Sequence, residues 1–288
     1  MMNDDTPFIQ FNNVSYRYDQ QSPAVIRDIQ LIIQRGDFVA LIGQNGAGKT
    51  TAAKHINGIL KPSSGQVLIE GRSTASYSRH EIARTIGYCY QNPDHQIFST
   101  TVENEVEYGA RALGYDSAKV KQQAELALDL VGLTARRKNH PSMLGRGERQ
   151  RLAVASILAM GVSTLVVDEP TTGLDYAGVV RIMDLLASWN QTLNTTIVII
   201  THDIPIVADY VPRTVLMGQG HILMDDSTGQ VLQAFDLLRS ASVRSPQVTR
   251  VAQRLNLLTD AVPVVTVSAF MLAFKQKLNE SAFLAKEG

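Results

Sequence analysis

The sequence has a single cysteine, no long apolar run and no excess of charge of either sign. One cysteine, Cys89, excludes an intramolecular disulfide and is compatible with a reducing compartment. Because no run reaches the ~18 apolar residues of a membrane span, we expect no transmembrane helix. Lys plus Arg and Asp plus Glu number 27 each, so the overall charge favours neither nucleic acid nor an anionic membrane as a partner. The start, MMNDDTPFIQFNN, is acidic and lacks the apolar core of a signal peptide, so we expect the cytoplasmic side.

Short apolar segments alternate with helical patterns, which predicts an α/β fold with helices covering a parallel sheet. The strand candidates lie at 38–42, 164–168 and 195–202. Between two of them, residues of about 92–160 are almost entirely helical in pattern, and we expect a helical subdomain there. Within it, the positions at helical spacing are Val120, Ala124, Ala127, Leu128 and Val131.

The C-terminal part is predicted to form a small helical extension over residues 236–288, after a larger α/β domain at 1–235. The boundary follows GQGHILMDD, which is typical of a hairpin. Ser245 and Pro246 are expected as the N-cap and first residue of one helix, and Ser268 as the start of a second. The predicted apolar faces are Val248, Val251, Ala252 and Leu255 in the first helix, and Phe270, Phe274 and Leu278 in the second.

The segment GQNGAGKTT, residues 43–51, matches the phosphate-loop pattern G-x-x-x-x-G-K-[ST] directly after an apolar strand and before a helical pattern. Gly46 and Gly48 allow the backbone to curl so that N–H groups point at the β- and γ-phosphates. Lys49 adds a positive charge, and Thr50 offers a hydroxyl to Mg²⁺.

A second buried strand ends in two carboxylates, in STLVVDEP at 163–170. With a phosphate loop in the chain, Asp168 is suited to hold magnesium through water. Glu169, one residue further and aimed differently, is suited to polarise the water that attacks the γ-phosphate. Taken alone, such a pair is more often a helix cap or a solvated loop. His202, just past the next strand, is expected to sense the γ-phosphate.

In this order the motifs resemble those of the nucleotide-binding subunits of ABC transporters, over about residues 8–230. Gln91 in CYQNPDHQIFSTTVENEVEYG is similar to the Q-loop glutamine, and Asp175 in PTTGLD to the D-loop aspartate. In VSYRY, Tyr18 is the better match to the tyrosine that stacks on adenine, with Tyr16 as the alternative.

The resemblance implies a P-loop NTPase with a mostly parallel sheet core, an antiparallel β subdomain, an inserted helical subdomain and the small helical extension. ATP and Mg²⁺ are the implied cofactors. The implied catalytic residues are Glu169, His202 and Gln91; the ATP-binding residues are Tyr18, Gly43, Asn45, Gly46, Gly48, Lys49, Thr50 and Thr51; and the metal ligands are Thr50, Gln91 and Asp168.

More narrowly, YQNPDHQIF followed by TTVENEVEYGARALG is similar to the ATPases of energy-coupling-factor (ECF) transporters, which take up vitamins and metal ions. The tail LLRSASVRSPQVTRVAQRL resembles their C-terminal extension, which joins two ATPases. The implied partners are a second ATPase, a membrane coupling subunit and a substrate-binding membrane subunit, at the cytoplasmic face of the cell membrane and without nucleic acid. The alternatives are the ATPase of a conventional binding-protein-dependent importer, a non-transport ABC ATPase, and a small-molecule kinase or GTPase.

One segment departs from the family, whose signature L-S-G-G-Q reaches across a dimer to the partner's γ-phosphate. The residues here are Leu144, Gly145, Arg146, Gly147 and Glu148. The serine hydroxyl is missing, which removes a hydrogen bond of about 1.5 to 3 kcal/mol. Arg146 is expected either to offset the charge of Glu148 or to contact phosphate itself. A heterodimer with a second, intact ATPase is favoured, and a homodimer is possible.

Three acids follow the Q-loop, at Glu103, Glu105 and Glu107. Glu103 and Glu107 would share one helix face. The hypothesis is that these acids receive arginines from a coupling helix of the membrane subunit; the alternative is a solvated acidic face.

Overall fold

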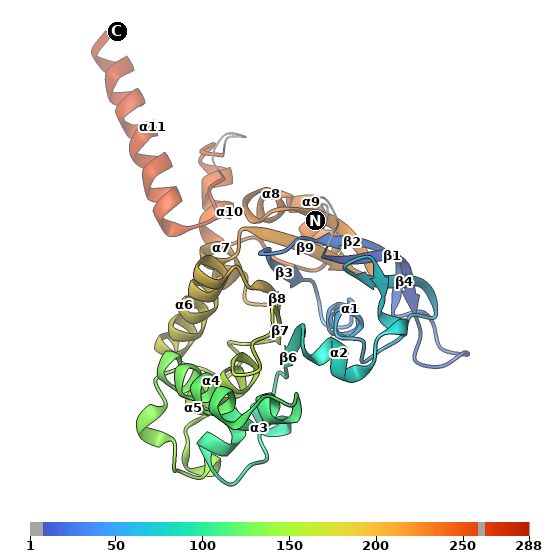
Figure 1. The fold of residues 1–288 in the computed structure, drawn as a ribbon. Coiled ribbons are helices and arrows are strands. Elements are labelled where there is room, and N and C mark those ends of the chain that lie inside the picture. Colours follow the sequence, from blue (N-terminus) through green and yellow to red (C-terminus); the bar gives the residue numbers. More distant parts are fainter. Residues whose placement is uncertain (1–7, 259–262, 288) are drawn as a thin grey trace, which may run out of the picture.

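The computed structural model describes residues 8–258 and 263–287, so the first seven residues of the expected ATP-binding domain lie outside it (Figure 1). The expected α/β fold with a mostly parallel sheet is confirmed. The larger sheet has the order β10-β9-β3-β8-β7-β6, and only β10 runs antiparallel to its neighbour. Its strands are β3 (Phe38–Ile42), β6 (Ile86–Cys89), β7 (Thr164–Asp168), β8 (Thr196–Ile200), β9 (Arg213–Gly218) and β10 (His221–Ser227).

The second sheet is antiparallel, in the order β2-β1-β4-β5, and is the expected β subdomain. Its strands are β1 (Ile9–Tyr16), β2 (Ile26–Ile33), β4 (Ser64–Ile69) and β5 (Arg72–Ser73). The short helix α2 (Arg79–Ala83) leads from this sheet into β6.

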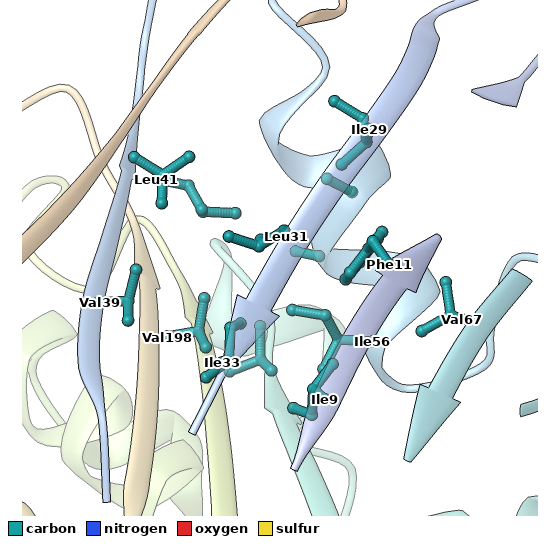
Figure 2. Close-up of a cluster of buried hydrophobic side chains, with 14 of the residues drawn as sticks. Ile9, Phe11, Ile29, Leu31, Ile33, Val39, Leu41, Ile56, Val67 and Val198 are labelled. Atoms are coloured by element: carbon teal, nitrogen blue, oxygen red, sulfur yellow. The ribbon is translucent and has the colours of Figure 1, made fainter. Parts of the chain in front are cut away.

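The two faces of the larger sheet bury different layers. On β3, Val39 and Leu41 pack toward the antiparallel sheet and helix α1 (Lys49–Ile56), where Ile56 lies among them (Figure 2). The alternate residues of β3 pack on the opposite face with helix α6 (Tyr176–Leu193). Because strand side chains alternate between faces, an entirely apolar strand predicts burial on both sides, which is the arrangement of β3.

Three longer helices form the region between β6 and β7: α3 (Val102–Ala112), α4 (Ser117–Leu130) and α5 (Arg146–Leu158), drawn in green in Figure 1. They share an apolar core of their own. The positions predicted from helical spacing are all buried: Val120, Ala124, Ala127, Leu128 and Val131.

The predicted hairpin is formed by β9 and β10, joined at Gln219 and Gly220, both with positive φ. Helix α7 (Ile204–Tyr210), between β8 and β9, and helices α8 (Thr228–Gln233) and α9 (Phe235–Ser240), after β10, pack on the same face of the sheet as α6. Helix α10 (Gln247–Arg254) and helix α11 (Val267–Glu287) follow, and α11 points away from the rest of the chain (Figure 1).

Two expectations for the extension are wrong in detail. Ser245 does not cap α10, because its buried hydroxyl donates to the carbonyl of Leu232 at 2.6 Å and ties the segment to α8. Leu278 does not join Phe270 and Phe274, which stack on each other and pack against the end of α10, since Leu278 is 53% exposed. Among the described residues, no helix is long and apolar enough to span a bilayer.

Candidate functional site

The phosphate loop joins β3 to α1, and glycines are required where it turns. Gly48 has φ 98° directly before α1, and a Cβ there would lie 2.7 Å from Ile26 Cγ2. Gly43 has φ 150°, and a Cβ would lie 2.2 Å from the carbonyl oxygen of Met217. The loop therefore keeps its backbone close to its neighbours while the first N–H groups of α1 face the space in front of the sheet.

Lys49 is buried, and its ammonium donates to the carbonyl oxygens of Gly43 at 2.8 Å and Gln44 at 3.0 Å. Burial lowers the pKa of Lys49, and the nearby carboxylates of Glu169 and Asp168 oppose that shift. The ammonium is thus held inside the curve of the loop, where a phosphate would meet a positive charge.

Asp168, at the end of β7, meets the loop through Thr50, whose hydroxyl lies 3.4 Å from Asp168 Oδ1. The other carboxylate oxygen, Oδ2, accepts a hydrogen bond from the hydroxyl of Tyr88 at 3.0 Å. Burial raises the pKa of Asp168, while the hydrogen bonds from Tyr88 and Thr50 lower it. A carboxylate and a hydroxyl converging beside a phosphate site suit Mg²⁺, which takes few protein oxygens and completes its shell with water and phosphate.

Glu169 and His202 form a direct pair, with His202 Nδ1 2.8 Å from Glu169 Oε1. The other carboxylate oxygen of Glu169, Oε2, lies 3.4 Å from the hydroxyls of both Thr172 and Thr201. Glu169 has φ 52°, a left-handed conformation that costs a non-glycine residue energy and is concentrated at functional sites. The backbone is held there by a hydrogen bond from its N–H to the carbonyl of Ile200.

Lys49, Thr50, Asp168 and Glu169 line one cavity of ≈ 410 Å³, whereas His202 and Gly43 line a neighbouring cavity that shares Asn45 with it. The first cavity brings six of the ATP-binding residues predicted from the phosphate loop together with the two carboxylates at the end of β7. Gln91 also lines it and is exposed. Its lining residues are Val25, Asn45, Gly46, Gly48, Lys49, Thr50, Thr51, Gln91, Asp168, Glu169 and Ile200. Residues far apart in the chain thus converge at the carboxyl ends of β3 and β7, where ligands of open α/β sheets bind.

Tyr18 stands at the edge of this site with 58% of its surface exposed. Its hydroxyl is 3.3 Å from that of Thr51, and its ring contacts Tyr16 edge-on at 5.1 Å. Tyr16 instead packs edge-on against buried His55 at 4.9 Å. An exposed ring next to the loop is better suited to stack on a base than a ring that packs on a helix.

The segment 144–148 contributes no lining residue to the cavity of its own chain. Glu148 accepts a hydrogen bond from the backbone N–H of Gly145 at 2.9 Å and pairs with Arg136 at 3.6 Å. The expectation that Arg146 offsets Glu148 is therefore wrong, since that carboxylate is engaged by Gly145 N–H and Arg136 instead. Within the described part of the chain, Arg146 has no ion pair, and its guanidinium carbon lies 2.5 Å from the position a Cβ on Gly173 would occupy.

The loop 170–175 thus lies against the start of α5. Asp175 caps α6 by accepting a hydrogen bond from the N–H of Gly178 at 2.8 Å. Arg146 and Asp175 are both exposed, so the altered signature and the D-loop match form neighbouring parts of one surface.

The three acids after the Q-loop are engaged within the chain, contrary to the hypothesis of free acceptors. Glu103 pairs with Arg137 and Lys138, and Glu107 pairs with Arg111. Glu105 is buried and accepts hydrogen bonds from the backbone N–H groups of residues 98 and 99. The acids therefore shape the local structure, and the hypothesis that they receive arginines has no support.

Tyr88 is a site residue that the sequence patterns missed. It lies in an apolar strand segment, where a tyrosine is ordinarily read as a core residue, and its hydrogen bond to Asp168 spans 80 residues. The sequence offers only an indirect indication of this role: a tyrosine in an apolar strand is expected to be buried, and a buried tyrosine hydroxyl needs a polar partner.

A parallel sheet with a phosphate loop on one strand end and two carboxylates on another defines a P-loop nucleotide-binding protein. The model of the family described as ABC transporter matches residues 26–172. The chain belongs to the ABC transporter family.

Relatives extend the match. An ATP-binding protein assigned to the ABC transporters of Methanosarcina acetivorans is 40% identical over 275 residues, which are 95% of this chain and 44% of that protein. The chain thus spans about half the length of the first such relatives. The energy-coupling factor transporter ATP-binding protein EcfA of Methanocaldococcus jannaschii is 36% identical over 258 residues, 89% of this chain and 91% of that protein. The resemblance to ECF ATPases is confirmed.

Solved structures agree with this assignment. The structure of cbiO1 from Clostridium perfringens, described as part of the ABC transporter complex cbiONQ, has a TM-score of 0.75 and 30% identity and covers 88% of this chain and 100% of that chain. The dimeric post-hydrolysis state of the ATP-binding cassette MJ0796, bound to ADP and Pi, has a TM-score of 0.69 and 25% identity over 76% of this chain and 98% of that chain.

Proposed function

We propose that the chain is the ATP-binding and ATP-hydrolysing subunit of a membrane transporter, of the ECF type that takes up a vitamin, a metal ion or a related small solute. The observation that carries the proposal is the Glu169–His202 pair beside the cavity that contains Lys49 and Asp168. A carboxylate hydrogen-bonded to an imidazole next to a phosphate loop is an arrangement for activating water at the terminal phosphate. The similarity to EcfA and cbiO1 supports the transport part.

In this proposal the chain's own groups divide the work. Lys49 and the N–H groups of α1 hold the phosphates, and Tyr18 stacks on the adenine. Glu169 accepts a proton from the attacking water, and His202 holds the Glu169 carboxylate in place. Thr50 and Asp168, with Gln91 nearby, would hold Mg²⁺, which neutralises phosphate charge when bound.

A second ATPase subunit completes the site in this proposal, with a heterodimer favoured over a homodimer. The segment 144–148 lies outside its own cavity, and the first N–H groups of α5 stand beside Arg146, which has no ion pair among the described residues. Because the Glu148 carboxylate accepts from Gly145 N–H and its charge is partly offset by Arg136, this surface is better suited to phosphate than the sequence suggests. Arg146 is positioned to donate to a partner's nucleotide where the family serine would.

We also propose that residues 1–235 form the ATP-binding domain and 236–288 a dimer-forming extension. The extension has its own small apolar cluster around Ala252, Leu257 and Val264. Val251 and Met271 are each 46% exposed, so apolar surface remains for a partner.

The membrane subunit is proposed to dock in an apolar groove of ≈ 400 Å³ between α2, α3 and α5. Phe98 and Tyr108 stand at its edge, 64% and 51% exposed and stacked edge-on at 4.6 Å. The Q-loop segment is linked to the signature, because Asp94 pairs with Arg149 at 2.9 Å and Arg149 donates to the carbonyl of Leu144 at 2.6 Å. Gln96 of the same segment lines the groove. A coupling helix in this groove would therefore act on both segments, at the cytoplasmic face of the membrane.

The test is affinity purification of the tagged chain from its native membranes in mild detergent, followed by mass spectrometry and an ATP turnover assay. We expect at least one membrane protein and Mg²⁺-dependent turnover. A second ATPase with a serine-containing signature would support the heterodimer, and this chain as the only ATPase would support the homodimer with Arg146. Recovery without any membrane protein, from membranes in which the chain is abundant, would contradict a transport function.

A further inference from the structure

Tyr88 is a buried hydroxyl donor whose partner among the described residues is one carboxylate. It lies in β6 with 8% of its surface exposed, and its hydroxyl donates to Asp168 Oδ2 at 3.0 Å. The direction of this bond follows from the groups themselves, because a carboxylate oxygen accepts and the phenolic O–H donates.

This hydrogen bond makes the two oxygens of Asp168 unequal. Oδ2 is occupied by Tyr88, and Oδ1 lies toward the hydroxyl of Thr50 at 3.4 Å. Asp168 is 6% exposed, so little water reaches it to replace a lost donor. Tyr88 therefore holds the carboxylate in the orientation that turns Oδ1 toward the Thr50 hydroxyl.

Tyr88 also links two neighbouring strands at their functional ends. β6 and β7 pair in parallel, with Tyr88 opposite Val166, and β6 leads directly into Gln91. The hydroxyl bond thus connects the strand that precedes the Q-loop to the strand that ends in Asp168.

We propose that Tyr88 is a positioning residue that sets the Mg²⁺ affinity of the nucleotide site through Asp168. The inference rests on the proposed ATPase function and adds to it a residue outside the family motifs. Groups that hydrogen-bond to a ligating carboxylate alter metal affinity by about 10- to 100-fold when removed. The predicted effect is on the metal and not on the binding of the nucleotide by itself.

The test is Tyr88→Phe, which keeps the ring and removes the hydroxyl. At saturating ATP, the Mg²⁺ concentration for half-maximal turnover should rise about tenfold. Binding of a fluorescent ATP analogue in EDTA should stay within about twofold of the wild type, while the gain in affinity on adding Mg²⁺ should shrink. Tyr88→His, which returns a donor, should recover part of the gain.

Tyr90→Phe is the matched control. Its ring lies 5.2 Å from that of Tyr88, it is 39% exposed, and its hydroxyl has no hydrogen bond among the residues the structure describes. Tyr90→Phe should leave the Mg²⁺ concentration for half-maximal turnover unchanged. A double-mutant cycle with Asp168→Asn adds a check, because Tyr88→Phe should have almost no further effect on the Mg²⁺ response once the carboxylate is gone.

An unchanged Mg²⁺ response in Tyr88→Phe would overturn the proposal, including the case in which only the thermal midpoint falls, since Tyr88 would then be a packing residue. Additive effects with Asp168→Asn would overturn it as well. These results are distinct from failure of the proposed function, which would appear as wild-type protein without Mg²⁺-dependent turnover.

Discussion

In the proposed function, Glu169 is the residue on which ATP hydrolysis depends most directly. Its carboxylate meets His202 on one oxygen and two threonine hydroxyls on the other, and its backbone is held at φ 52°. A side chain fixed by three partners is pre-oriented for a proton transfer, which contributes about 10²- to 10⁴-fold to a rate.

Glu169→Gln should therefore lower steady-state ATP turnover of the assembled complex by about a hundredfold or more. The amide keeps the size of the side chain but is not a base. Binding of a fluorescent ATP analogue serves as the control and should be retained. Turnover near that of the wild type would show that another group activates the water.

The sequence predicted most of the individual site residues, because a phosphate loop and a strand-terminal Asp-Glu pair are local patterns. The cavity indeed brings Lys49, Asp168 and Glu169 together. Tyr88 and the real partner of Glu148 were not predicted, since both depend on which strands and helices become neighbours. Local patterns identify a residue's chemistry, and only the fold identifies its partners.

At the level of elements, α2 offers a test of pH dependence. Its N-terminus has a capping box in which Ser78 and Glu81 bond each other's backbone N–H, and Arg72 adds a hydrogen bond. These bonds lower the pKa of Glu81 from 4.5 to about 2. Because the folded pKa is lower, the stabilisation is complete above the unfolded value and is lost as pH falls toward the folded one.

Glu81→Gln should thus lower the thermal midpoint modestly near pH 7, and the gap from the wild type should close between pH 5 and pH 2. Differential scanning calorimetry across this range measures it. Asp129→Asn, which removes an exposed carboxylate on α4, is the control and should show no such convergence. A gap that stays constant down to pH 2 would mean that the charge of Glu81 does not stabilise α2.

In the C-terminal extension, the apolar periodicity predicts the helices but not which of their apolar residues are buried within this chain. The periodicity predicted α10 and α11 within a few residues, but Val251, Leu255 and Leu278 are exposed in this chain. An apolar helix face indicates burial without saying whether the cover comes from the same chain or from another.

Val251→Glu together with Met271→Glu should weaken association between ATPase subunits at least about tenfold, because each side chain has only about half its surface left to bury and full burial of one contributes ~1.5 to 3 kcal/mol. Analytical ultracentrifugation measures the dissociation constant. Leu126→Glu places the same charge on α4 at a residue that is 53% exposed, and it should have little effect. If Leu126→Glu weakened association as much as the Val251 and Met271 changes do, the effect would reflect a general loss of stability, and the extension would not be the dimer contact.

For the whole molecule, the apolar groove with Phe98 and Tyr108 lies next to helices that reach both the Q-loop and the signature. Residues of α2, α3 and α5 line it, so its shape depends on how the helical region is set against the sheet. A membrane subunit bound there would respond to any rotation of that region.

Phe98→Ala with Tyr108→Ala should reduce recovery of the membrane subunit about tenfold, since large aromatic side chains commonly dominate interface energy. Turnover by the ATPase alone should change little. Leu130→Ala, also a well exposed apolar residue on α4, is the matched control. Full recovery of the membrane subunit with the double variant would exclude the groove as the docking surface.

The separation of Lys49 from the segment 144–148 also has a genetic consequence. The cavity that contains Lys49 takes no lining residue from that segment. In a pair of identical chains, each nucleotide would be held by Lys49 of one chain and approached by Arg146 of the other. A chain without Lys49 and a chain without Arg146 would each be defective alone, yet their mixed pairs would contain one intact site. Two loss-of-function alleles of this one chain would then complement each other when expressed together.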